Sequence, residues 1–346
     1  MRRLPVFFVL DCSESMIGEN LKRMNDGLQK IVSDLRKDPH ALETVWVSVI
    51  AFAGIARTIV PLHDIVSFYP PRLPVGGGTN LATALRELTT QIDSQVRKTT
   101  LEEKGDWQPV VYLLTDGRPT DDISADVKRW NESYAKKVNM IAVGIGPSVD
   151  LSVLRQLTEN VLSFTENQEG DFSRFIQWIT ASVTAHSRSV GEDSQPPLKQ
   201  TDYIVKLAKD ETARAYDENC VVLTGRCSKT RRPYLIKYER PPARVSGLAF
   251  DLNLNSFNIA GCYPVDEDYF SWTDMSVAGA QINTSELHGV PGCPHCGNSS
   301  AFAMCTCGKL LCIDGPDDVN CPWCGKGLSF QSEGGNSDFN VSRGRG

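Results

Sequence analysis

The chain of 346 residues is 41% hydrophobic and 23% charged, with a net charge of −6 and a pI of about 5.5. This length predicts at least two domains, and the acidic balance argues against broad binding to nucleic acid or membranes. The apolar run over residues 4–10 is too short for a signal peptide and meets Asp11 without a small-residue cleavage pattern. No stretch approaches the roughly 18 apolar residues of a membrane-spanning helix, so we expect a cytoplasmic protein.

The first predicted element is a buried strand, the apolar run from Val6 to Leu10, which ends at Asp11. Such runs are typical of central strands in parallel sheets, whose carboxyl ends open into ligand-binding loops. Ser13 and Ser15 follow at alternate positions, so this loop offers oxygen ligands with little charge. These ligands suit magnesium or manganese with retained waters better than a soft transition metal.

Strand and helix patterns then alternate along the first half of the chain. Period-2 or apolar runs predict strands, and apolar residues at helical spacing predict helices. Further strands are expected over residues 45–52, 56–61, 110–115, 139–145 and 161–164, and helices over 21–35, 81–96, 121–137, 151–157 and 172–183. This alternation predicts an α/β fold with a doubly wound, mostly parallel sheet.

Two later loops add oxygen ligands to the first. A glycine-rich loop over residues 76–78 ends at Thr79, just before a predicted helix, and the strand over 110–115 is followed by Asp116. Taken separately, Thr79 is explained as a helix cap and Asp116 as a turn residue. Together with the D-x-S-x-S stretch, however, these loops supply two carboxylates and three hydroxyls in one order along the chain.

In these residues the sequence resembles the von Willebrand factor A family, whose metal-ion-dependent adhesion site uses D-x-S-x-S, a distant threonine and a distant aspartate. The resemblance implies a Rossmann-like fold that binds Mg2+ or Mn2+. It assigns direct coordination to the three hydroxyls, and direct or water-mediated contact to the two carboxylates. It also leaves one coordination position for an Asp or Glu of a partner protein. The implied ligands are Asp11, Ser13, Ser15, Thr79 and Asp116.

The composition changes after the predicted α/β domain. Residues 187–200 are polar with two prolines and are interpreted as a linker. Residues 201–290 lack a long helical period, and we expect short strands over 221–223 and 234–238. The tail has little apolar surface to bury and is expected to be disordered. The predicted units are a domain over 1–186, the linker 187–200, a β-rich region over 201–290, a zinc ribbon over 291–330 and the tail 331–346.

The zinc ribbon is predicted from two C-P-x-C-G motifs, at Cys293/Cys296 and Cys321/Cys324. Each forms a tight turn whose amides point at the thiolates, and two facing turns build a tetrahedral four-sulfur Zn2+ site. Strands over residues 301–304 and 309–313 complete the ribbon. Cys305, Cys307 and Cys312 are expected to be buried thiols. The alternatives are that they replace a ligand of this site, or that they hold a second ion if His288 or His295 joins them. Cys220, Cys227 and Cys262 show no ligand spacing and stay unassigned.

A basic stretch runs from Arg226 to Arg244, with seven Lys or Arg residues against one acid, Glu239. We interpret it as the solvated face of a β-hairpin. An acidic or phosphorylated partner is the alternative.

Over nearly its full length, from the five site residues to the CPHCG, CTCGKLLCI and CPWCG segments, the sequence resembles the TerY family of bacterial tellurite-resistance and chemical-stress proteins. The resemblance implies a scaffold or regulator that works with a serine/threonine kinase and a metal-dependent protein phosphatase. We therefore predict a non-catalytic, metal-dependent interaction protein.

Two other function classes stay open at this point. A magnesium-dependent phosphotransferase with Asp11 as nucleophile needs a second acid two residues further on, and that position is Ser13. Nucleic-acid binding through the zinc ribbon and the basic stretch runs against the net charge of −6.

Overall fold

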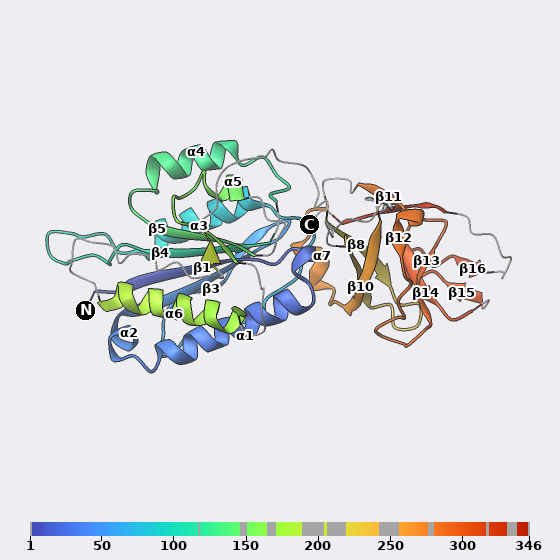
Figure 1. Ribbon diagram of the computed structural model, residues 1–346, viewed down its shortest axis with the longest axis horizontal. Coiled ribbons are helices and arrows are strands. Elements are labelled where there is room, and N and C mark those ends of the chain that lie inside the picture. The colour runs from blue at the N-terminus through green and yellow to red at the C-terminus, as the bar shows by residue number, and fades with distance from the viewer. Residues whose placement is uncertain are drawn as a thin grey trace, which may run out of the picture.

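A computed structural model gives the structure of the chain. It describes residues 2–116, 118–145, 151–164, 171–188, 204–205, 219–241, 256–275, 280–315, 318–330 and 338–344. These residues form two lobes, an N-terminal α/β lobe and a mainly β C-terminal lobe, with helix α7 (Asp268–Trp272) close to their junction (Figure 1). None of the helices in these segments combines the length and the apolar character that crossing a bilayer requires.

The N-terminal lobe is built on a seven-stranded sheet in the order β3-β2-β1-β4-β5-β6-β7. The strands from β2 through β6 pair in parallel, and the two edge strands β3 and β7 are antiparallel to their neighbours. The bounds are β1 Leu4–Asp11, β2 Val45–Phe52, β3 Ala56–Asp64, β4 Val110–Thr115, β5 Asn139–Ile145, β6 Val161–Phe164 and β7 Ile204–Val205. The predicted doubly wound, mostly parallel sheet is confirmed.

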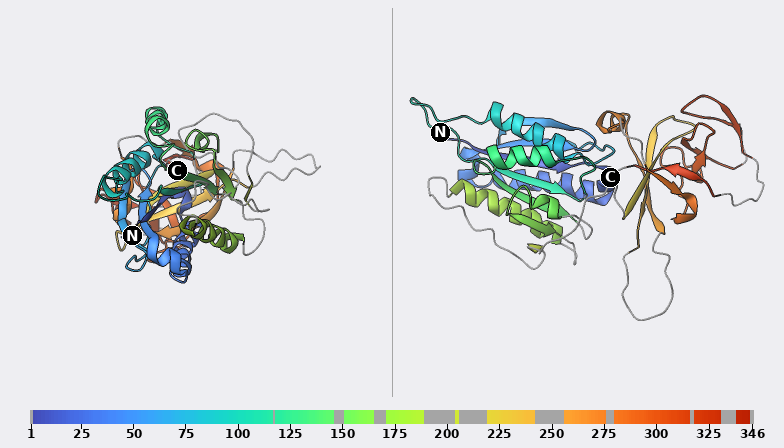
Figure 2. Two further views of the ribbon diagram at one scale, coloured as in Figure 1. Left: turned by 90° about the vertical axis from the view of Figure 1, so that its left-hand side faces the viewer. Right: turned by 90° about the horizontal axis from the view of Figure 1, so that it is seen from above.

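Helices cover both faces of this sheet (Figure 2). Because successive side chains of a strand point to opposite faces, Val6 and Phe8 pack in the core that contains α1 and α6, whereas Phe7 and Val9 pack in the core that contains α3 and α4. All four are at most 2% exposed, which is why β1 reads as a continuous apolar run. The helices are η1 Glu14–Met16, α1 Glu19–Leu35, α2 Pro39–Thr44, α3 Leu81–Gln95, α4 Ser124–Ser133, α5 Leu151–Leu154 and α6 Asp171–Arg188.

Helix α2 differs from the sequence-based prediction, which placed Pro39 beyond the end of a helix. Pro39 instead begins α2, and the carboxylate of Asp38 accepts a hydrogen bond from the N–H of Ala41 at 3.0 Å. Proline suits a first helical position because its missing N–H would have no partner there in any case.

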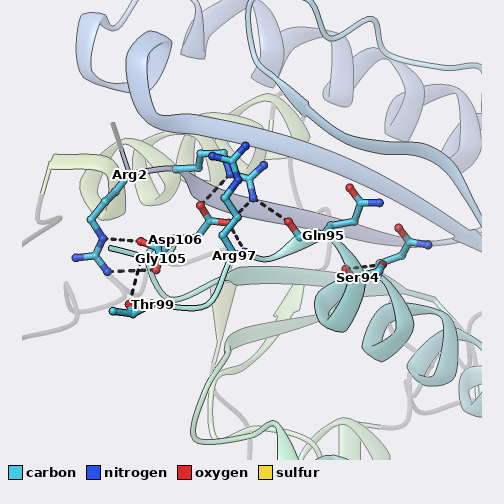
Figure 3. A network of polar contacts seen from close by, with 9 residues as sticks. Arg2, Ser94, Gln95, Arg97, Thr99, Gly105 and Asp106 are labelled. Atoms are coloured by element: carbon cyan, nitrogen blue, oxygen red, sulfur yellow. Dashed lines mark hydrogen bonds and ion pairs between the residues drawn. The ribbon is translucent and has the colours of Figure 1, made fainter. Parts of the chain in front are cut away.

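A polar network holds the loop after α3 against the start of β1 (Figure 3). The guanidinium of Arg3 contacts both carboxylate oxygens of Asp106 and the carbonyl of Gln95, and Arg2 donates to the carbonyl of Gly105. The N–H of Arg97 donates to the same carboxylate of Asp106 at 2.8 Å. The side chain of Asp106 is only 2% exposed, so this pair lies inside the lobe.

The C-terminal lobe contains a six-stranded sheet in the order β12-β10-β9-β8-β14-β13. Strands from the predicted β-rich region and from the predicted zinc ribbon share this sheet, because β14 pairs in parallel with β8. Within the described residues the two regions are therefore one structural unit. The bounds are β8 Cys220–Arg226, β9 Pro233–Glu239, β10 Phe257–Pro264, β11 Gln281–Asn283, η2 Thr284–Glu286, β12 Leu287–His288, β13 Ser300–Met304, β14 Leu310–Ile313, β15 Asp318–Asn320, β16 Gly327–Ser329 and β17 Asn340–Ser342.

The predicted disordered tail needs correction where the structure describes it. Strand β17 pairs with β11, and Val341 packs in the core of the lobe with 3% of its surface exposed. Phe339 packs against the same core, with its ring centroid 5.9 Å from that of Phe302. Two apolar residues therefore anchor this segment, although the rest of the tail is polar. Residues 331–337 of the predicted tail and 189–200 of the predicted linker lie outside the described residues, and Ser187 and Arg188 end helix α6.

Candidate metal centres

The first candidate centre lies where β1 and β4 end. These strands are neighbours in the sheet, so their carboxyl ends bring Asp11 and Asp116 to the same edge. The hydroxyls of Ser13 and Ser15 lie 2.9 Å apart, and the Ser15 hydroxyl donates to Oδ1 of Asp116 at 2.8 Å. The N–H of Ser13 donates to Oδ1 of Asp11 at 2.9 Å, which closes the loop on itself.

The fifth predicted ligand, Thr79, is brought to this edge by the glycine-rich loop. The N–H of Gly76 donates to the carbonyl of Cys12 at 3.0 Å, and Gly76 forms a parallel bridge with Ser13. Thr79 is 1% exposed, and its buried Oγ1 has no hydrogen-bond partner within the part of the chain that the structure describes. A buried hydroxyl is normally paired. Its lone pairs therefore fit a cation among the neighbouring oxygens.

Burial is the main cause of a raised pKa at Asp11. Desolvation raises the pKa of this carboxyl to about 6, although the hydroxyl of Thr115 and the N–H and hydroxyl of Ser13 lower it. The Thr115 hydroxyl donates to Oδ2 of Asp11 at 2.5 Å. This carboxylate is fully buried, so water does not stabilise its negative charge. A bound divalent cation would stabilise it instead.

Neighbouring residues support the loops rather than adding charge to the site. The carboxylate of Asp121 accepts hydrogen bonds from the N–H groups of Leu81 and Ala82 and so caps α3. The sequence-based prediction had placed Asp121 at the start of the following helix instead. The Thr120 hydroxyl accepts from the N–H of Thr79 at 3.0 Å. Cys12 is fully buried, as predicted. Sequence reasoning missed Thr115 and Thr120, because nothing in a single sequence distinguishes them from other strand-end threonines.

The cysteines form two candidate centres, not one, and this corrects the predicted four-sulfur site. The Sγ atoms of each group lie within 4.8 Å of one another, and the two predicted C-P-x-C-G motifs fall into different groups. The first group combines Cys293 and Cys296 with two cysteines left out of the predicted site, and the second group does the same for Cys321 and Cys324. The groups are Cys227, Cys293, Cys296, Cys312 and Cys305, Cys307, Cys321, Cys324.

The spacing of the sulfur atoms fits zinc. A tetrahedral zinc with Zn–S bonds of about 2.3 Å separates its sulfur atoms by about 3.8 Å. The Sγ of Cys296 lies 3.6 Å from that of Cys312, and the Sγ of Cys305 lies 3.7 Å from that of Cys324. All eleven cysteines are free of disulfides. Each group therefore has the number and arrangement of ligands that a structural zinc site requires.

The parallel pairing of β8 with β14 explains how Cys227 joins the first group. Cys227 directly follows β8, and Cys312 lies on β14, so the pairing of Leu311 with Arg226 brings the two thiols together. Burial raises the pKa of the Cys227 thiol, but hydrogen bonds from Thr230 outweigh it and lower the pKa to about 6, which favours the thiolate that binds metal. The signal available in the sequence was the even count of eight cysteines, once Cys227 is included.

Comparison with known families identifies both lobes. Residues 6–177 match the von Willebrand factor type A domain, and residues 217–346 match the TerY-C metal binding domain. The chain has the domain architecture of the TerY family. The family resemblance predicted from the sequence is therefore confirmed. The two cysteine groups both lie in the TerY-C domain, and the oxygen site lies in the von Willebrand A domain.

Individual relatives resemble the von Willebrand A half of this TerY-like chain. Inter-alpha-trypsin inhibitor heavy chain H1 of Bos taurus is 27% identical over 158 residues, which cover 44% of this chain and 17% of that protein. The chain thus spans about a sixth of the length of this relative. A von Willebrand factor type A structure from Catenulispora acidiphila has 19% identity and a TM-score of 0.41, covering 53% of this chain and 43% of that one. A proximal thread matrix protein from mussel byssus, solved with zinc in its MIDAS motif, has 20% identity and a TM-score of 0.39, covering 53% and 48%.

The basic stretch of the TerY-C domain is only partly a solvated face, so that prediction needs correction. The ammonium of Lys237 is buried and donates to the carbonyl of Ser15 in the von Willebrand A domain at 2.8 Å. Arg226 pairs with Glu267 and lies over the rings of Phe270 and Trp323. The alternation of β9 puts its one basic side chain, Lys237, toward the other domain. Arg231 and Arg232 in the preceding turn are exposed, as predicted.

Proposed function

We propose that this TerY-like protein is a non-catalytic, metal-dependent interaction scaffold. In the von Willebrand A domain, Asp11, Ser13, Ser15, Thr79 and Asp116 hold Mg2+ or Mn2+, and the ion binds an Asp or Glu of a partner protein. The observation that carries this proposal is the buried hydroxyl of Thr79, which has no partner among the described residues and lies on a loop joined to the Ser13 loop through Gly76. The serine hydroxyls of that second loop are in turn linked to Asp116 on the third. Three hydroxyls leave the ion short of negative charge, so a carboxylate from outside adds a favourable ligand.

In the TerY-C domain we propose two structural zinc ions. Each is held by four cysteines, one pair from a C-P-x-C-G turn and two further thiols. Four thiolates fill a tetrahedral coordination sphere and leave no open position for a substrate. The zinc ions therefore hold the domain together rather than perform chemistry.

The absence of catalysis is part of the proposal. Asp11 is fully buried, and both of its carboxylate oxygens accept hydrogen bonds, from Ser13 and Thr115, which supports a role in holding the loop and the ion rather than in attacking a substrate. The position where a phosphotransferase of this type needs an acid carries Ser13. The von Willebrand A relatives support an interaction role, since their printed names are those of inhibitor heavy chains and pilus adhesins.

The partners we propose are a serine/threonine kinase and a metal-dependent protein phosphatase in the cytoplasm of a bacterium, within the response to tellurite and chemical stress. The TerY architecture supports this placement.

A capture experiment from lysate of the source organism tests the function. Tagged full-length protein is incubated with Mg2+, with EDTA, and as the Thr79→Val variant in Mg2+. We expect a kinase or phosphatase identified by mass spectrometry in the first sample and its loss from the other two. Equal capture in all three samples would refute metal-dependent binding. Sustained phosphatase activity of the pure protein, abolished by Asp11→Asn, would refute the non-catalytic role.

A further inference from the structure

The TerY-C domain packs on the loops that form the oxygen site of the von Willebrand A domain. We propose that this domain is the resting occupant of the metal-bearing face, and that a partner carboxylate reaches the ion only after the two domains separate. The inference rests on the proposed function, because it names what regulates access to the same site.

The most direct contact is made by Lys237 on β9. Its ammonium donates to the carbonyl of Ser15, a proposed ligand, at 2.8 Å and pairs with the carboxylate of Glu239. The Ser15 hydroxyl in turn donates to Asp116, a second proposed ligand, so a cation of the TerY-C domain lies beside the site. The positive charge of Lys237 repels a bound divalent ion, and this repulsion weakens as the two domains move apart. Metal binding therefore favours domain separation.

The residues between the proposed ligands also belong to this contact. Glu14, between Ser13 and Ser15, is fully buried and accepts a hydrogen bond from the phenol of Tyr269 on the TerY-C domain. Ile17 is 5% exposed and packs, with Val75, in an apolar cluster whose other members belong to the TerY-C domain. Glu14 and Ile17, in and beside the loop that supplies two proposed ligands, are thus covered by the other domain.

Glycines permit this close approach. A Cβ at Gly76 would lie 2.5 Å from the carbonyl oxygen of Trp272, and a Cβ at Gly54 would lie 2.1 Å from the N–H nitrogen of Asp274. The N–H of Gly77 donates to the hydroxyl of Thr273 at 2.9 Å. The glycine-rich loop before Thr79 therefore presents its bare backbone to the segment that ends α7 (Figure 1).

The composition of the interface favours reversible contact. Lys237 and Glu14 are both ionisable and both buried, and burying charged groups costs free energy. Lys237 recovers part of this cost through its contacts with Ser15 and Glu239. Contacts between domains of one chain resemble transient protein interfaces, and relative motion is their usual behaviour. The contact is strong enough to hold the domains together without a partner and weak enough for a partner to replace.

The test uses the full-length protein loaded with Mn2+ and a wedge at the interface. In Gly76→Ala the three atoms nearest to the added Cβ all belong to Trp272, so the strain falls on the domain contact. Gly327→Ala is the matched control, because its added Cβ meets nothing closer than 3.6 Å. Thr273→Ala weakens the same contact from the other side and keeps the test valid if the wedge variant folds poorly.

Three measurements report separation of the two domains when no partner protein is present. They are the radius of gyration by small-angle X-ray scattering, hydrogen exchange of the 76–79 segment, and the water-proton relaxivity of bound Mn2+. We expect Gly76→Ala and Thr273→Ala to raise all three relative to wild type and to Gly327→Ala. Unchanged values in both interface variants would overturn the proposal. Metal-dependent capture of a partner at equal strength by wild type and Gly76→Ala would overturn it too and leave the proposed function intact. Separation in both variants with capture insensitive to chelator would support the domain contact and refute the proposed function instead.

Discussion

The hydroxyl of Ser15 donates to the carboxylate of Asp116 at 2.8 Å, across 101 residues of sequence. This bond exists because β1 and β4 are adjacent in the sheet, although the β2–β3 hairpin and helices α1, α2 and α3 separate them in the chain. It places a hydroxyl of one loop and a carboxylate of another within the reach of one ion. The oxygen site is therefore a product of the sheet topology, and the sequence supplies its members in three separate pieces.

Zinc content distinguishes two centres from one. We expect about two zinc ions per wild-type chain by elemental analysis, and about one in Cys227→Ser, because Cys227 belongs to only one sulfur group. Cys305→Ser should also lose about one ion, from the other group. Cys220→Ser is the control, since Cys220 belongs to neither group. Wild-type content near one ion, unchanged in Cys227→Ser, would restore the single site built from Cys293, Cys296, Cys321 and Cys324.

The buried pair between Arg3 and Asp106 should dominate the ionic contribution to stability. Asp106→Ala leaves the guanidinium of Arg3 buried without its partner, and we expect the free energy of unfolding to fall by about 3 kcal/mol. Asp34→Ala is the control: its partners Lys30 and Lys37 are 50% and 69% exposed, so about 0.5 kcal/mol or less is expected. Urea denaturation of both variants measures the difference. Equal losses would show that the network in Figure 3 adds no more than a surface ion pair.

Stability of the von Willebrand A domain should depend on the protonation of His186. Burial lowers the pKa of His186 below its ordinary value of 6.5, and the Nδ2 group of Asn139 lies 2.7 Å from its Nε2. The unfolded chain therefore takes up the proton first as the pH falls. This stabilisation is complete above the unfolded value and is lost as the pH drops through the lower folded value. Thermal unfolding should show a smaller loss of Tm on acidification in His186→Gln than in wild type, and an equal loss would contradict this role.

The strands and helices of the von Willebrand A domain were predictable because apolar periodicity reports burial on one or both faces. Strand β2 has the predicted bounds of residues 45–52, and β1 has the expected continuous apolar character. Helix α2 was missed because Pro39 reads equally as a stop or as a first helical residue. The segment over 338–344 was missed because one buried residue, Val341, leaves no periodic signal.

The two kinds of site differed in how far sequence reasoning reached. The oxygen site was predictable because its spacing matches a family pattern in order along the chain. The zinc ligands were mispaired because local motifs show which cysteines form turns and not which turns face each other. That information lies in the pairing of β8 with β14, which joins Cys227 to Cys312 across 85 residues of sequence.

The most direct test of the account is the Mn2+ affinity of Thr79→Val, measured by titration calorimetry at neutral pH. Since Oγ1 of Thr79 has no hydrogen-bond partner among the described residues, the variant should unfold in EDTA at the wild-type temperature or slightly above it. Thr83→Val is the matched control, because the Thr83 hydroxyl donates to the carbonyl of Asn80 within α3. We predict a loss of about tenfold or more in Mn2+ affinity for Thr79→Val, corresponding to at least about 1.4 kcal/mol, and wild-type affinity for Thr83→Val. Wild-type affinity in Thr79→Val would contradict the metal site and the interaction function built on it.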